Sequence, residues 1–413
     1  MLLAIGGIVL CLAVIQSAGA FGLSRLLGRS AQAKPNLAVA EKVVELTPAD
    51  AQAHFVRAGV LSTLNRIPES ATELEHAVGL RPTDYSLWSQ LGLLRDQLGD
   101  TRGALAAFDE AVKRAPYYAR PYWQRGNVLL RAGQYEEAFK DLGQAAQSDP
   151  ELMPKLINLA WALSKGNANL TEQWAQIKTN SARITFVTFL ANQGRNSEAI
   201  AHFRAVEAFP EDLRRQLVEQ LIAKSGFAEA FEVWRSTQDP NPSATDAVTL
   251  LYDGEFEAAL KFDQGGFGWR VPRNSQGITF SLDASQPNIG RKNLRIDFGG
   301  PSNPGQDLVS QLLLVKPSEK YQVNFASRSQ DVVTGGRPLM VVTDAQGDRK
   351  RLGQSIPLGD TGTSGWKVVS FEFSTGPDTK AVVLSLQRES CSRSPCPIFG
   401  SLFLDSVSVV QVN

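Results

Sequence analysis

The residues of this 413-residue chain best suited to chemistry are three cysteines and three histidines. Cys391 and Cys396 lie close together in the stretch CSRSPC, whereas Cys11 lies in an apolar N-terminal segment. A zinc site needs four ligands, and every histidine is in the N-terminal half of the chain, so these two thiols do not complete one. We therefore predict a disulfide between Cys391 and Cys396, which would form in an oxidising compartment. The alternative is a pair of free thiols in a loop.

The sequence contains no convincing catalytic pattern. The C-terminal part has no histidine, and GGFG at 265–268 lacks the Gly-Lys-Ser/Thr continuation of a phosphate-binding loop. The 42 basic residues balance 42 acidic ones, so no positive excess favours a nucleic-acid partner. We predict a protein that is not an enzyme and does not bind nucleic acid.

The N-terminal segment at 1–24 carries no charged side chain and contains the run LLAIGGIVLCLAVI. A run of this length can cross a bilayer as a helix, so it predicts a transmembrane anchor. The alternative is a signal peptide cleaved near AGA at 18–20. Arg25, Arg29 and Lys34 would hold the following segment in the cytoplasm, but the cysteine pair favours the other side. We expect a membrane-anchored protein with most of the chain periplasmic or otherwise extracytoplasmic.

The next part of the sequence repeats with a period of 34 residues. Three classes of residue keep this period: prolines 48, 82, 116 and 150, the small residues Ala58, Gly92 and Gly126, and the large apolar residues Leu74, Phe108 and Leu142. This pattern resembles the tetratricopeptide repeat, with repeats at 51–84, 85–118 and 119–152. The small residues would let paired helices approach closely, and each proline would end a helix. We expect an α-solenoid of helix hairpins over 36–236.

Repeats of this family present a groove that binds a protein or a peptide. In the third repeat the groove should be lined by Trp123, Gln124, Asn127 and Arg131. Asn127 and Arg131 match two positions that some members use to clamp a peptide carboxylate, but Trp123 stands where those members have lysine. The clamp is therefore incomplete, and ordinary packed or solvated residues are the alternative. Trp234 is expected to pack between helices.

After a turn-rich linker at 237–249, apolar residues alternate with a period of two. The pattern predicts eight strands, at 277–283, 293–298, 307–315, 319–328, 338–343, 366–373, 380–387 and 402–410. Tyr321, Val323 and Phe325 should point into the core. We expect an antiparallel β-sandwich of the jelly-roll type at 250–413, and so a multidomain α + β chain.

Landmarks in this β-domain suggest a ligand class. GFGW at 266–269, GWKVVSFEFST at 365–375 and SLFLDSVSV at 401–409 resemble those of carbohydrate-binding modules with a galactose-binding-like jelly roll. The resemblance implies a structural calcium held by Glu257 and Asp405, because calcium takes oxygen ligands. Ordinary surface carboxylates are the alternative.

One sheet face of the β-domain should be strongly polar and could bind a polysaccharide. Its candidate residues are Gln322, Asn324, Arg328 and Glu372. Sugars also use an aromatic platform, which is not evident here, so a solvated face is the alternative.

Together these features predict a membrane-tethered adaptor that acts in cell-envelope or exopolysaccharide assembly. Its solenoid would bind a protein, and its β-domain a glycan or a second partner. Two other functions remain open at this point. One is an accessory or undetected catalytic component of polysaccharide processing, and the other is a cytoplasm-facing assembly factor whose β-domain is only structural.

Overall fold

The computed structural model describes most of the chain, with side chains from residue 14 onward. The described residues are 2–238, 250–263, 265–273, 277–300, 302–359, 362–392 and 395–412. They form two compact units, residues 1–186 and 187–413, and helix α11 (Asn180–Asn192) crosses the division. The linker predicted at 237–249 lies almost entirely outside the described residues.

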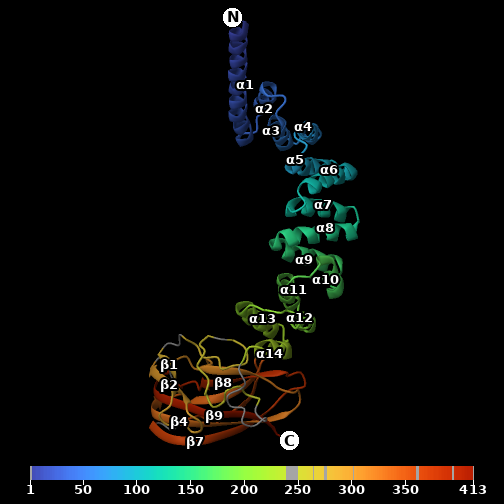
Figure 1. Cartoon of the computed structure of the whole chain (residues 1–413). Helices are drawn as coiled ribbons and strands as arrows, with labels where there is room; N and C mark the ends of the chain where they lie inside the picture. Colours follow the sequence, from blue (N-terminus) through green and yellow to red (C-terminus); the bar gives the residue numbers. More distant parts are fainter. Residues whose placement is uncertain are drawn as a thin grey trace. The chain divides into compact units, whose positions relative to one another are not determined.

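The first unit is built from antiparallel helix pairs that follow one another along the chain (Figure 1). Its helices are α1 (Leu2–Ala33), α2 (Leu37–Leu46), α3 (Ala51–Thr63), α4 (Ile67–Leu80), α5 (Tyr85–Gln97), α6 (Thr101–Arg114), α7 (Ala119–Arg131), α8 (Tyr135–Ser148), α9 (Met153–Leu163) and α10 (Ala168–Ala175). Gly99 and Gly133 turn the chain within two hairpins at φ values of 78° and 77°, which only glycine adopts freely. The expected helical repeats are therefore confirmed.

Each hairpin of the central repeats closes on a residue with little or no side chain. A Cβ atom on Gly92 would lie 2.8 Å from Cζ of Phe108, and one on Gly126 would lie 2.8 Å from Cγ of Leu142. Phe108 and Leu142 are themselves fully buried. The large side chain at one position thus fills the space that the glycine leaves on the paired helix, as the 34-residue period predicted.

Helix α1 extends the repeat pattern toward the N-terminus. Ser24 lies 34 residues before Ala58, is buried, and its hydroxyl lies 2.8 Å from that of Thr47 on the C-terminal side of α2. Arg25 forms an ion pair of 3.0 Å with Asp50, the N-cap of α3. The second half of α1 therefore packs as the partner of α2.

The expected membrane anchor and the location derived from it are corrected by this packing. Within the part of the chain that the structure describes, no helix is long and apolar enough to cross a membrane. The helix extends beyond the predicted 1–24 segment, to Ala33. Gln16, Ser24, Arg25 and Arg29 interrupt its apolar character, and Ser24 and Arg25 bind other helices. The prediction was wrong because it weighed only the first apolar run.

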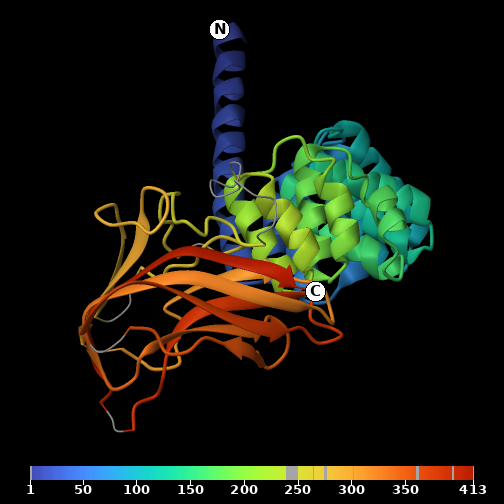
Figure 2. The same cartoon turned by 90° about the horizontal axis from the view of Figure 1, so that it is seen from below.

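The second unit contains three further helices and an all-antiparallel β-sandwich (Figures 1 and 2). The helices are α12 (Asn196–Phe203), α13 (Glu211–Ala223) and α14 (Phe227–Arg235). The strands are β1 (Ile278–Asp283), β2 (Asn293–Gly300), β3 (Val309–Leu314), β4 (Lys320–Thr334), β5 (Pro338–Asp344), β6 (Arg351–Gln354), β7 (Gly362–Ser374), β8 (Ala381–Arg388) and β9 (Ile398–Val412). One sheet has the strand order β1-β2-β9-β4-β7, and the other has the order β3-β8-β5-β6.

The core of the β-sandwich lies between these two sheets. Tyr321, Val323 and Phe325 on β4 are at most 1% exposed, which confirms the predicted alternation. The strand β6 was not predicted, because its sequence RLGQ has one large apolar residue and lies at a sheet edge. A bulge in β9, with Ser406 at a φ of 54°, interrupts the register and leaves Asp405 fully buried.

The glycine contact in the second repeat can be tested with a matched pair of substitutions. We expect Gly92→Ala to lower the free energy of unfolding by about 1–3 kcal/mol, because its Cβ would overlap the ring of Phe108. Gly59→Ala on α3 is the control, since a Cβ there meets nothing within 4 Å, and it should stabilise the helix by about 0.5–1 kcal/mol. Denaturant unfolding followed by far-ultraviolet circular dichroism measures both. Equal effects of the two substitutions would contradict the proposed contact.

Candidate functional site

The four residues predicted to line the solenoid groove all lie on α7. Trp123, Asn127 and Arg131 are spaced by four residues and so form one stripe along the helix, with Gln124 beside it. Trp123, Gln124 and Asn127 are half-buried, whereas Arg131 is exposed. The structure thus brings these four side chains to neighbouring positions on one helix.

Neither clamp residue is poised for a peptide carboxylate. Arg131 forms an ion pair of 2.5 Å with Asp96 on α5, so a ligand carboxylate would compete with Asp96 for it. The Asn127 side-chain amide donates to the backbone carbonyl of Trp123 at 2.7 Å. Gln124 is different, because its Oε1 atom is buried and has no hydrogen-bond partner among the described residues. The groove therefore has an unsatisfied acceptor but no unpaired cation at these positions.

A half-buried arginine connects α7 to two neighbouring helices. The Arg125 guanidinium contacts Asp141 on α8 at 2.5 and 2.7 Å and Asp109 on α6 at 2.7 Å. Hydrogen bonds to Asp141 raise the pKa of Arg125 above its ordinary value, against the effect of burial. Sequence reasoning missed this network, which positions the helix that carries the groove stripe.

The same arrangement recurs 68 residues earlier, and this spacing was the signal that could have revealed it. Arg57 on α3 lies 3.1 Å from Glu73 on α4 and 3.9 Å from Glu41 on α2. In the second repeat the corresponding residues are Leu91 and Ala107, which belong to an apolar cluster. The chain therefore uses an ion pair and an apolar contact at equivalent places.

Aromatic rings and glycines join α14 to the loop that precedes the β-sandwich. The Trp234 ring meets Tyr252 edge-on with centroids 5.1 Å apart, and Phe231 meets Phe267 in the same way at 5.1 Å. Gly266 has a φ of 96°, and a Cβ there would lie 2.6 Å from the Trp234 ring. The GGFG stretch thus makes a close backbone contact, and Trp234 packs against the β-domain rather than between helices.

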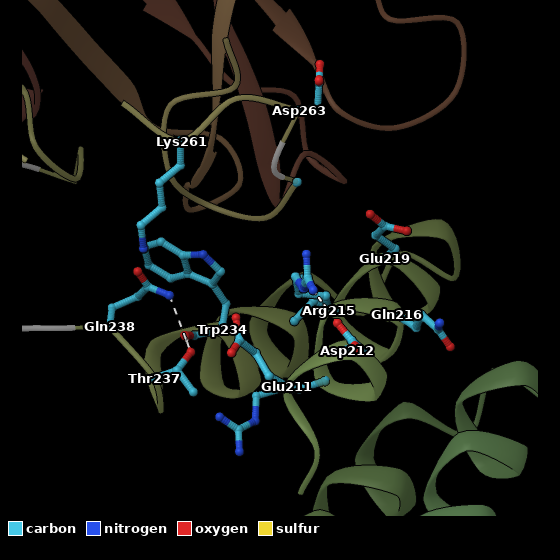
Figure 3. A pocket seen from close by; sticks show the side chains of 13 residues that line it. Glu211, Asp212, Arg215, Gln216, Glu219, Trp234, Thr237, Gln238, Lys261 and Asp263 are labelled. Atoms are coloured by element: carbon cyan, nitrogen blue, oxygen red, sulfur yellow. Dashed lines mark hydrogen bonds and ion pairs between the residues drawn. The ribbon is translucent and has the colours of Figure 1, made fainter. Parts of the chain in front are cut away.

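A pocket of about 640 Å³ opens beside this contact (Figure 3). Its walls are α13, the end of α14 and the loop residues Lys261, Asp263 and Gly265, and Lys261 extends toward the Trp234 ring. Arg215 and Asp212 in its wall form an ion pair with each other. Acidic and basic residues are nearly balanced in the described lining, so the pocket does not select one sign of charge.

The predicted glycan residues share the outward face of the five-stranded sheet, but two of them are already engaged. Arg328 lies 3.8 Å from the centre of the Phe403 ring, donates to Gln286 at 3.0 Å and pairs with Asp283 at 3.8 Å. Asn324 accepts a hydrogen bond from Ser370. Gln322 and Glu372 are opposite each other on β4 and β7. Arg328 therefore covers a ring of its own sheet.

The two carboxylates that the resemblance assigns to calcium are used as hydrogen-bond acceptors by one loop. Glu257 accepts from the backbone N–H groups of Arg291 and Lys292. Asp405 accepts from the N–H groups of Asn288 and Ile289, at 2.7 and 3.2 Å. No group of three or more His, Cys, Asp or Glu side chains within the described residues is arranged to hold a metal. Calcium binding by Glu257 and Asp405 therefore stays a prediction.

Cys391 and Cys396 are joined by a disulfide, with Cα atoms 5.6 Å apart. Arg388 holds the loop that this bond closes. Its guanidinium is buried and donates to the carbonyls of Ser302, Gly336 and Cys396. Burial lowers the pKa of Arg388, since none of its hydrogen-bond partners in the described structure is a carboxylate.

Comparisons with known proteins bear on the helical part of the chain. Residues 89–152 match the family model of the tetratricopeptide repeat, so the chain contains such repeats. Over 101 residues it is 33% identical to Protein FlbA of Caulobacter vibrioides, covering 24% of this chain and 17% of that protein. Over 135 residues it is 33% identical to BBSome complex member bbs-4 of Caenorhabditis elegans, covering 30% and 28% respectively. The chain thus spans less than a third of either curated relative.

A solved structure described as "CBM4 structure and function" is also similar. It is 15% identical, covers 39% of this chain and 99% of its own, and has a TM-score of 0.28. A likeness at this level carries no argument about the β-domain. Its galactose-binding-like character therefore remains a prediction.

The contribution of the Arg125–Asp141 ion pair to stability can be compared with that of the apolar contact at the equivalent place in the second repeat, between Leu91 and Ala107. We expect Asp141→Ala to lower the free energy of unfolding by about 1–3 kcal/mol, because it leaves the half-buried Arg125 with only Asp109 as a carboxylate partner. The double substitution Arg125→Leu with Asp141→Ala copies Leu91 and Ala107 and should recover most of that loss. Denaturant unfolding of the helical part measures both. A double variant as unstable as the single one would contradict this interpretation.

The buried Asp405 should make the stability of the β-domain depend on pH. Burial raises the pKa of Asp405, although the N–H groups of Ile289 and Asn288 oppose this shift. A raised pKa means that the neutral acid is favoured in the fold, so its contribution is present at low pH and is lost as pH rises through the folded pKa. The stability of the wild-type protein relative to Asp405→Asn should therefore increase as pH is lowered from 7 toward 4. Thermal unfolding of both proteins across this range measures the trend, and a constant difference would contradict it.

Proposed function

We propose that this protein is a non-enzymatic adaptor whose solenoid groove binds an extended segment of a partner protein. The observation that carries the proposal is the stripe of Trp123, Asn127 and Arg131 on α7, inside repeats that match the tetratricopeptide-repeat family. Helix pairs of this kind present a continuous surface for protein recognition. The ion pairs of the half-buried Arg125 hold that surface in place, which lowers the entropy cost of binding.

The chemistry of the groove favours an internal peptide segment over a chain terminus. A terminal carboxylate needs an unpaired cation, whereas Arg131 is paired with Asp96 and lysine is absent at Trp123. Leu93, which is 34 residues before Asn127, is exposed on α5 and offers an apolar contact.

The β-domain supplies the second half of the proposed adaptor. A β-sandwich with two broad faces can hold a ligand on a face without disturbing its core, because the core side chains point inward. We assign to the β-domain a ligand rich in hydroxyl groups, in keeping with the glycan binding that the sequence predicted. The protein would then join a partner protein to a glycan.

Peptide display on the full-length protein tests the first half of this proposal. Internal segments should be selected, and capping their terminal carboxylate as an amide should change Kd by less than about threefold. Leu93→Ser combined with Asn127→Ala should weaken binding at least tenfold, since each tenfold step is only about 1.4 kcal/mol. Glu137→Ala with Lys140→Ala, two exposed positions on α8, is the control and should leave Kd unchanged. Loss of binding on amide capping would instead indicate capture of a chain terminus.

A further inference from the structure

A second pocket lies on the outward face of the four-stranded sheet, away from the face predicted to bind a glycan. Its volume is about 610 Å³. Strands β3, β5, β6 and β8 contribute Ser310, Thr343, Arg351 and Gln387, and the segment before β1 contributes Arg270. The pocket is therefore built on regular strands, whose paired backbones hold its walls in place.

Positive charge dominates the lining of this pocket. Arg270, Arg349 and Arg351 face one carboxylate, that of Asp307. Arg349 lies 3.5 Å from Asp307, but Arg351 donates only to the neutral amide oxygens of Gln354 and Gln387. The Arg270 side chain has no hydrogen bond or ion pair with any described residue. Two guanidinium groups thus remain without a carboxylate in the described structure, which suits an anionic ligand.

A hydrogen-bond network around Gln387 lies beside these arginines. Gln387 donates to Asp307 at 2.9 Å and to the Ser385 hydroxyl at 3.2 Å, and it accepts from Arg351 at 3.3 Å. This network fixes the orientation of the Gln387 amide and of the Arg351 guanidinium before any ligand arrives. Planar amide, carboxylate and hydroxyl groups of this kind can pair with the hydroxyl groups of a sugar.

The form of the pocket favours a saccharide over an acidic peptide. Peptides that bind a sheet through their backbone add a strand at an open edge, whereas this pocket lies on a face. Its described lining is polar apart from Pro272 and offers no apolar recess for peptide side chains. The groups present match a ligand that carries both carboxylates and many hydroxyl groups.

We propose that this pocket binds a carboxylate-bearing polysaccharide, with Arg270 and Arg351 contacting its uronate carboxylates and Gln387 and Asp307 its hydroxyl groups. The inference rests on the second half of the proposed function and places that half on the four-stranded sheet. It does not depend on the solenoid groove.

Affinity electrophoresis of the full-length protein through polygalacturonate tests the proposal. The matched probe is the same polymer with its carboxylates methyl-esterified, and poly-glutamate represents an acidic peptide. We expect polygalacturonate to retard the protein and the esterified polymer to retard it at least tenfold less. Arg270→Gln with Arg351→Gln should weaken the apparent affinity at least tenfold. Lys320→Gln with Lys367→Gln, which removes the same charge from the five-stranded sheet, should leave it within about twofold.

Three results would overturn the proposal. These are no retardation by polygalacturonate, equal loss in the arginine and lysine variants, or stronger retardation by poly-glutamate, which would assign the pocket to an acidic peptide. If the double arginine variant melts early, Arg270→Gln alone serves the test, because the exposed Arg270 side chain has no hydrogen bond or ion pair with the described residues. Peptide binding by the same variants should be unchanged. Failure of the saccharide site is thereby distinguished from failure of the solenoid groove.

Discussion

The close approach of paired helices is the constraint on which the solenoid depends. At intervals of 34 residues one helix must present a side chain small enough for its partner to touch its backbone. The positions that do so are Ser24, Ala58, Gly92 and Gly126. Phe108 and Leu142 lie within van der Waals overlap of any Cβ at the last two. Because this contact sets the hairpin angle, it also sets the direction in which α7 presents its groove stripe.

Charge is used in the solenoid where an apolar contact would also serve. Arg57 and Arg125 each connect three helices through two carboxylates, whereas the second repeat has Leu91 at the same place. A buried ion pair offers little net stability over an apolar pair, but it requires one geometry. The consequence for function is a groove whose neighbouring helices keep a fixed spacing. The residues that line the groove then select the ligand. Here the pairing of Arg131 with Asp96 disfavours a terminal carboxylate.

The sequence was informative where a pattern has a fixed period and uninformative where contacts join distant segments. The 34-residue repeat and the alternation of Tyr321 and Val323 predicted the helices and the buried strand face. The apolar run at the start of α1 obscured Ser24, which only the repeat period marks as a solenoid residue. The arginine pocket could not be predicted, because Arg270 and Arg351 come from separate segments and β6 has almost no strand signal.

The central claim is that the solenoid groove is the surface that receives a partner protein. Hydrogen–deuterium exchange of the full-length protein, with and without a partner segment selected by display, tests it most directly. Slowed exchange should be concentrated in α5 and α7, the helices that carry Leu93 and Asn127. Slowed exchange confined to the β-sandwich, with α5 and α7 unchanged, would contradict the account.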